Sequence, residues 1–159
     1  MFQAENYSGT KEENYTLVIK QLQALLAGEK NVIANLSNAT AILNQFLNDI
    51  NWVGFYLMEE NELVLGPFQG LPACIRIPLG KGVCGSAAQE QTVYRVGDVH
   101  MFPGHIACDA ASRSEIVLPI MKEGKLLGVL DIDSPSNDRF DEIDENMLKQ
   151  FVAALESFI

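Results

Sequence analysis

Hydrophobic residues recur at helical spacing over the first 48 positions of the chain. Thr10 followed by Glu13 has the pattern of a capping box and predicts a helix from about residue 10 to 27, which Gly28 ends. A second amphipathic helix is predicted over residues 31–48. Its expected buried stripe contains Ile33, Leu36, Ala39, Leu43, Phe46 and Leu47. Two helices therefore precede any strand.

From residue 51 the pattern changes to short runs of β-branched and aromatic residues, which is typical of strands. The predicted strands cover residues 52–58, 62–65, 74–78, 115–121 and 125–133, with a Gly-rich, irregular segment before the last two. A final amphipathic helix follows. This order predicts an α+β fold with helices packed on one face of an antiparallel sheet.

No repeat, low-complexity tract or Pro/Ser-rich linker divides the chain, so one domain is expected over residues 1–159. Within it we expect N-terminal helices over 1–48, the sheet and its loops over 51–134, and a C-terminal helix over 138–159.

Three carboxylates fall near one another in the predicted hairpin. A three-residue loop at positions 122–124 places Glu115 directly opposite Asp131, and Asp133 on the same face. A two-residue loop would instead turn Glu115 to the face of Ile132. Like charges opposite each other are destabilising, so such a cluster requires a cation, a shared proton or exposure to solvent.

Composition limits the function classes. The 159 residues are 48% hydrophobic, enough to bury a core, and 11 Lys and Arg stand against 21 Asp and Glu, a formal charge of -10. This charge argues against binding to nucleic acid or to an anionic membrane. No apolar run reaches the roughly 20 residues of a membrane span, and residues 1–10 do not resemble a signal peptide, so a cytoplasmic protein is expected.

The chain has an odd number of cysteines, three, and no C-x-x-C motif. A zinc site with His100 or His105 is conceivable, but the short ligand pairs of structural zinc sites are missing, so no metal is expected. Cys74 falls in a predicted apolar strand, where a buried thiol acts as a small hydrophobe. Cys84 and Cys108 fall in Gly-containing loops, which makes them candidates for chemistry.

Cytoplasmic thiol chemistry takes few forms: acyl transfer with a histidine such as His105, metal binding, or a redox cycle through sulfenic acid and disulfide. The sequence places three acidic residues and no Lys or Arg near the expected pocket. This favours a substrate with a cationic group, such as the ammonium of an amino acid. Trp52 and Tyr56 lie on one face of a predicted strand and could form its wall.

Six segments together are specific for one known family. They are NWVGFY at 51–56, GPFQG at 66–70, GKGVCG at 80–85, GHIACD at 104–109, SEIV at 114–117 and LDIDS at 130–134. With these segments the whole chain resembles the free methionine-(R)-sulfoxide reductases, which are single GAF-type domains. The resemblance implies a six-stranded antiparallel sheet with helices on one face and a small-molecule pocket on the other. It also implies reduction of free methionine-(R)-sulfoxide, recycling by thioredoxin, and no cofactor.

The resemblance also implies roles for individual residues. Cys108 matches the cysteine that attacks the sulfoxide sulfur and becomes a sulfenic acid, and Cys74 matches the resolving thiol that forms a disulfide with it. Cys84 matches a third pocket cysteine, either an alternative resolving thiol or one that exchanges roles with Cys108. The residues matching the substrate pocket are Trp52, Tyr56, Ile106, Glu115, Asp131 and Asp133.

The three carboxyls complete the expected catalytic set. A sulfoxide oxygen leaves only after protonation, so one carboxyl is expected to stay neutral as the acid, with a preference for Glu115, while another holds the ammonium.

Two rival classes of function stay open: a GAF-type small-molecule sensor, and a structural or dimerising role of the terminal helices. A homodimer is therefore the one assembly left open.

Overall fold

The computed structural model describes residues 6–106 and 108–159. Residues 1–5 of the expected domain, and Ala107 of the segment at 104–109, lie outside the described residues. The strands are β1 (Trp52–Glu59), β2 (Glu62–Gly70), β3 (Arg76–Pro78), β4 (Tyr94–Val96), β5 (Ser114–Lys122) and β6 (Lys125–Ser134). These strands form a six-stranded sheet in the order β3-β2-β1-β6-β5-β4, and every neighbouring pair is antiparallel.

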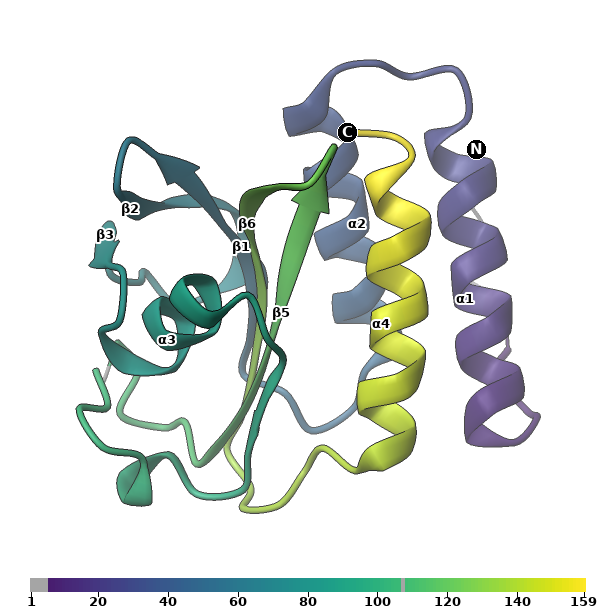
Figure 1. Cartoon of the computed structure of the whole chain (residues 1–159). Coiled ribbons are helices and arrows are strands. Elements are labelled where there is room, and N and C mark those ends of the chain that lie inside the picture. Colours follow the sequence, from purple (N-terminus) through teal and green to yellow (C-terminus); the bar gives the residue numbers. More distant parts are fainter. Residues whose placement is uncertain (1–5, 107) are drawn as a thin grey trace.

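Helices α1 (Lys11–Leu26), α2 (Val32–Phe46) and α4 (Glu142–Glu156) lie on one face of this sheet (Figure 1). Their apolar stripes pack on Phe55 of β1 and Ile132 of β6, which are both fully buried. The predicted α+β fold, with helices on one face of an antiparallel sheet, is confirmed. Among the described residues, no helix has the length and apolar character needed to cross a membrane.

The predicted start of the first helix is confirmed. Thr10 Oγ1 accepts a hydrogen bond from the Glu13 N–H, and Glu13 Oε2 accepts one from the Thr10 N–H, so both halves of the capping box form. The second helix starts after Asn31, whose side chain caps it. Ile33, expected in its buried stripe, is 57% exposed; it lies in the first turn and points away from the core.

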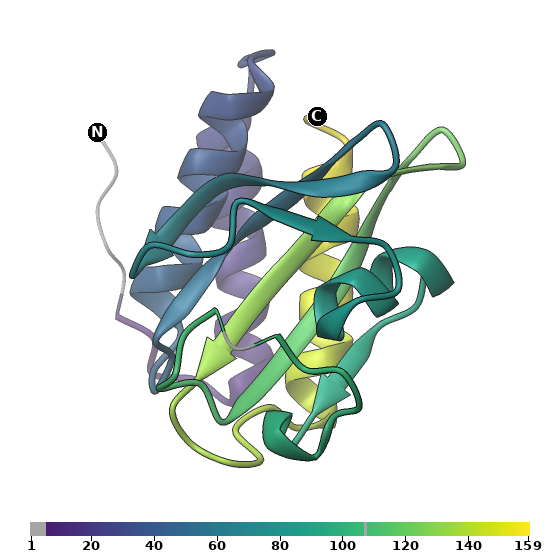
Figure 2. The same ribbon diagram turned by 90° about the vertical axis from the view of Figure 1, so that its left-hand side faces the viewer.

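A further helix, α3 (Gly82–Glu90), packs on the opposite face of the sheet together with long loops (Figure 2). The sequence pattern did not indicate α3, because a nine-residue helix with two glycines has little stability of its own. Packing against β3 stabilises α3. A Cβ at Gly85 would collide with the Pro78 carbonyl, so only glycine lets α3 approach β3 this closely.

The β5–β6 hairpin differs from the prediction in its turn and in its pairing. The loop has two residues, Glu123 and Gly124, both with positive φ, as in a type I′ turn. A register shift between Ile120 and Met121 then adds one residue to β6. Glu115 consequently pairs with Asp133 rather than with Asp131. The bulge compensates for the shorter loop, so the three carboxylates still share one face.

Candidate active site

A pocket opens on the face of the sheet that carries α3. It is bounded by strands β1, β5 and β6, the first turn of α3 and the loops before β3 and β5, and its empty volume including the open mouth is about 530 Å³. Every expected site residue except Cys74 lines it: Trp52, Tyr56, Cys84, Ile106, Cys108, Glu115, Asp131 and Asp133. Residues from separate segments of the chain thus meet in one cavity.

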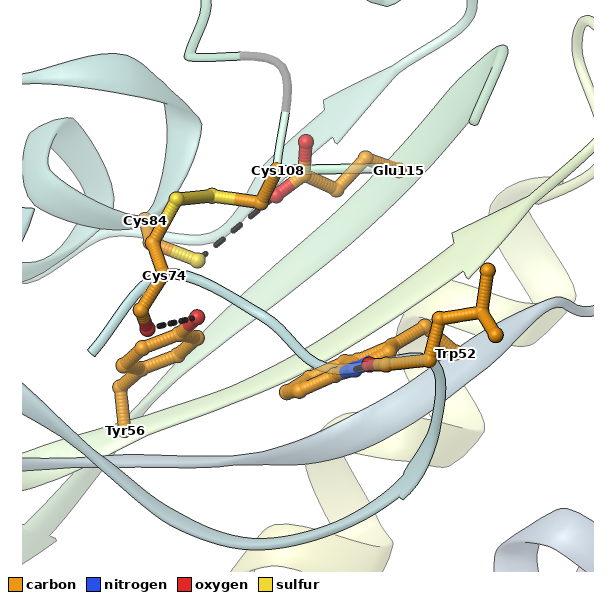
Figure 3. The surroundings of a disulfide bond; sticks show 7 residues. Trp52, Tyr56, Cys74, Cys84, Cys108 and Glu115 are labelled. Carbon is orange, nitrogen blue, oxygen red and sulfur yellow. Dashed lines mark hydrogen bonds between the residues drawn. A yellow bond between two sulfur atoms is a disulfide. The ribbon is translucent and has the colours of Figure 1, made fainter. Parts of the chain in front are cut away.

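A disulfide joins Cys74 to Cys108 beside this pocket, with the two Cα atoms 5.6 Å apart (Figure 3). Cys74 lies in the connection between β2 and β3, not in a strand as expected from its apolar neighbours. Tyr56 Oη donates a hydrogen bond of 2.9 Å to the Cys74 carbonyl and so ties this connection to β1. The disulfide therefore links two loops that border the same cavity.

Cys84 keeps a free thiol and is buried in the first turn of α3, not in a loop as its glycine neighbours suggested. Its Sγ donates to Glu115 Oε1 at 3.7 Å (Figure 3). Burial raises the pKa of the Cys84 thiol, and the charges of Asp131 and Glu115 raise it further. This sulfur consequently stays a protonated thiol.

Aromatic rings form one wall of the pocket. Trp52 stacks on Tyr56 with ring centroids 5.9 Å apart, and on Phe68 of β2 with centroids 5.3 Å apart. Trp52 Nε1 donates to the Leu71 carbonyl at 3.2 Å, which fixes the indole plane. Phe68 itself does not line the pocket and supports the Trp52 ring from behind.

The carboxyl cluster is mostly buried. Glu115 and Asp131 are only 6% and 5% exposed, so exposure to solvent, one of the alternatives for the cluster, is wrong for these two groups. Asp131 Oδ1 is buried and finds no hydrogen-bond partner among the described residues. A buried, unpaired acceptor is costly, so this oxygen suits a donor supplied by a ligand.

Burial raises the pKa of all three carboxyls. The charges of Asp131 and Asp133 raise the pKa of Glu115 further, and Asp131 has the same effect on Asp133. The pKa of Asp131 is raised to about 6, because burial outweighs hydrogen bonds to Glu115 and Cys84 that lower it. The cluster thus retains protons at pH values where ordinary carboxyls are ionised.

Two contributors to the site were missed by the sequence analysis. Asn51 Nδ2 donates to Asp109 Oδ2 at 2.9 Å and to Ser112 Oγ at 3.1 Å, which holds the loop after Cys108 against the start of β1. Lys81, the residue before α3, lines the pocket and corrects the expectation that no Lys or Arg lies near it. Asn51 lies in the family segment 51–56 and Lys81 in the segment 80–85. Their positions at the site depend on contacts between residues far apart in the chain, which the sequence pattern does not indicate.

Replacing Asp131 with asparagine is expected to stabilise the fold at neutral and alkaline pH. The pKa of Asp131 rises from 3.8 to about 6 on folding, so its contribution to stability is complete below pH 3.8 and is lost as pH rises through about 6. The asparagine side chain cannot ionise, so the gain in unfolding free energy should be about 2 kcal/mol larger at pH 8 than at pH 4. Urea unfolding of wild type and variant at pH 4 and pH 8 measures this difference. Glu123→Gln, on the exposed turn, is the control. An equal gain in unfolding free energy at the two pH values would contradict the raised pKa of Asp131.

Comparison with known proteins finds the same architecture elsewhere. The GAF domain model matches residues 31–159. The free methionine-R-sulfoxide reductase of Escherichia coli (strain K12) is 54% identical over 149 residues, covering 94% of this chain and 90% of that protein.

Two solved structures are similar over nearly the whole chain. The fRMsr of Staphylococcus aureus in its reduced form has a TM-score of 0.89 and 55% identity, covering 97% of this chain and 98% of that one. The free methionine-R-sulfoxide reductase of Neisseria meningitidis, solved in complex with its substrate, has a TM-score of 0.94 and 43% identity, covering 99% of this chain and 95% of that one.

Proposed function

This chain belongs to the GAF domain family and, within it, to the free methionine-R-sulfoxide reductases, and from that membership we propose that it reduces free L-methionine-(R)-sulfoxide to L-methionine. The observation that carries the proposal is the Cys74–Cys108 disulfide beside a pocket that holds a cluster of carboxyls with raised pKa values. A pocket that only senses a ligand needs neither feature.

In the first step the reduced Cys108 sulfur attacks the sulfoxide sulfur. The oxygen passes to Cys108, which becomes a sulfenic acid, and methionine leaves with its sulfur reduced by two electrons. The Cys74 thiol then attacks the sulfenic sulfur, and the disulfide forms as water departs. A dithiol reductant, proposed to be thioredoxin in the cytoplasm, returns both sulfurs to thiols and is itself oxidised.

Glu115 is the proposed acid. Burial and the neighbouring charges raise the pKa of the Glu115 carboxyl well above its usual range and so favour its neutral form, which has a proton to share with the sulfoxide oxygen. Asp131 and Asp133 raise that pKa. Asp131, with a pKa of about 6, is mostly ionised at pH 7, and a bound ammonium would lower the raised pKa of Asp133, so both are suited to bind the substrate ammonium. The free Oδ1 of Asp131 supports this assignment.

Recognition of a free amino acid also requires a partner for its carboxylate. Lys81 lines the pocket directly before α3, where unpaired backbone N–H groups of the first turn attract an anion. We assign the carboxylate to this end of the pocket, and the substrate side chain to the wall made by Trp52, Tyr56 and Ile106. Peptide-bound methionine sulfoxide has neither a free ammonium nor a free carboxylate and should be excluded.

Cys74 is favoured over Cys84 as the resolving thiol. Resolution requires a thiolate, and the buried Cys84 has a raised pKa that opposes one. Cys74 is only partly buried and lies close enough to Cys108 for the bond.

The single domain over residues 1–159 and the homodimer both stay predictions.

Cys74→Ser should trap the first intermediate. Without the resolving thiol, the variant is expected to form one methionine per chain and then to stop, with Cys108 as a sulfenic acid and the protein heavier by one oxygen atom. Intact-protein mass spectrometry after a single addition of substrate measures this. Cys84→Ser is the matched control and should form the Cys74–Cys108 disulfide; the opposite pattern would contradict the assignment.

The proposed function is tested by NADPH consumption in a thioredoxin-coupled assay. Free L-methionine-R-sulfoxide, its S epimer and a peptide-bound methionine sulfoxide are compared at equal concentration. Turnover confined to the free R epimer supports the proposal. Equal turnover of the peptide would show that the ammonium and carboxylate contacts proposed here are wrong.

A further inference from the structure

Three buried side chains of different elements converge at the inner end of the pocket. Cys84 comes from the first turn of α3, Glu115 from β5 and Asp131 from β6. One potential ligand atom from each residue lies within 4.8 Å of the other two, and all three residues are buried. From this geometry we infer that the pocket also binds a thiophilic divalent cation such as Zn²⁺, held by Cys84, Glu115 and Asp131.

The spacing suits zinc. Zinc bonds of about 2.3 Å to sulfur and about 2.1 Å to oxygen, at a tetrahedral angle, separate the two ligand atoms by about 3.6 Å. Cys84 Sγ and Glu115 Oε1 are 3.7 Å apart. The spacing of this pair thus already matches that of two zinc ligands, and the third ligand atom, from Asp131, lies within 4.8 Å of both.

A second observation indicates a ligand at this position. Asp131 Oδ1 is buried without a hydrogen-bond partner among the described residues, so one coordination site is already free of competing contacts. Lys81 is the one Lys or Arg among the described pocket residues, and it is exposed at the outer end. A divalent cation would supply the positive charge that the inner end lacks.

The donor set predicts which cations bind. A thiolate favours Zn²⁺ and Cd²⁺ over Mg²⁺, which prefers oxygen ligands alone. Three protein ligands leave a fourth position that faces the pocket. On binding, the Cys84 proton and the protons held by the carboxyl ligands go to solvent, so affinity should rise with pH.

Such an ion would occupy the place proposed for the substrate ammonium and sulfoxide oxygen. It is therefore an inhibitory ligand that competes with substrate, not a cofactor. The binding itself does not depend on the proposed reaction, because it requires only the three ligands.

The experiment titrates Cd²⁺ into the protein in its Cys74–Cys108 disulfide form, where Cys84 is the one free thiol. Ultraviolet absorption from cadmium–thiolate charge transfer is expected to saturate at one ion per chain. Zn²⁺ should displace the cadmium, and Mg²⁺ should not. Because the disulfide form performs no catalysis, a negative result here and a failure of the reductase assay are separate findings.

Variants identify the ligands. Cys84→Ser should abolish the absorption, and Glu115→Gln and Asp131→Asn should each weaken cadmium binding at least about tenfold. Glu123→Gln removes the same charge from the exposed turn and should leave binding unchanged; thermal unfolding checks that each variant is folded. Absence of the band, or a band unaffected by both carboxyl substitutions, would overturn the inference.

Discussion

Cys108→Ser is expected to lower the rate of methionine formation from free methionine-R-sulfoxide by at least about 10³-fold, the scale of losing a catalytic nucleophile. A serine hydroxyl is a far weaker nucleophile toward the sulfoxide sulfur than a thiolate. The coupled assay measures the rate, and direct quantification of methionine confirms it. Because the variant also cannot form the Cys74–Cys108 disulfide, its failure should appear even in a single turnover.

The same substitution at Cys84 is the matched control. Cys84→Ser replaces a weak thiol donor to the Glu115 and Asp131 carboxyls with a hydroxyl donor and should change the rate by less than about tenfold. If Cys84→Ser were inactive and Cys108→Ser active, the two thiols would have the exchanged roles that the sequence left open. That outcome would contradict the assignment of the nucleophile.

Glu115→Gln should lower kcat by about 10²- to 10⁴-fold, the usual contribution of a positioned general acid. Glutamine keeps the shape of the side chain but has no acidic proton. For wild type, kcat is expected to fall as pH rises through the raised pKa of Glu115, because the ionised carboxylate cannot protonate the sulfoxide oxygen. In the variant this alkaline decline should disappear.

The pH profile of kcat separates catalysis from substrate binding. A variant that raised KM but kept both kcat and the alkaline decline would show that Glu115 holds the ammonium, and the proton donor would then be another carboxyl. Glu123→Gln, which removes a carboxylate on the exposed β5–β6 turn, should leave kcat and its pH profile unchanged.

Much of the fold could be predicted from the sequence, because most elements have strong local signals. The Thr10 capping box and the amphipathic stripe of α4 both identify real helices. The β5–β6 turn could not be predicted: Glu123 and Gly124 form a two-residue turn, and a bulge further along β6 restores the face of Glu115. Bulges have no simple sequence signal, since they depend on how the two strands pack.

The site was predicted less completely than the fold. The carboxyl cluster followed from strand alternation, but the helical position of Cys84 did not, because α3 depends on packing against β3 through Gly85. Contacts such as Asn51 to Asp109 span 58 residues and leave no periodic pattern. The roles of the cysteines came from family resemblance, since spacing alone cannot pair them.

A single turnover of fully reduced protein with free L-methionine-R-sulfoxide, without any added reductant, tests whether Cys108 and Cys74 together reduce the sulfoxide. The methionine released per chain is counted, and the disulfide formed is identified by peptide mass spectrometry. We expect one methionine per chain, a Cys74–Cys108 disulfide, and no product from the S epimer. Release of no methionine, or a disulfide that contains Cys84 in place of Cys74, would contradict it.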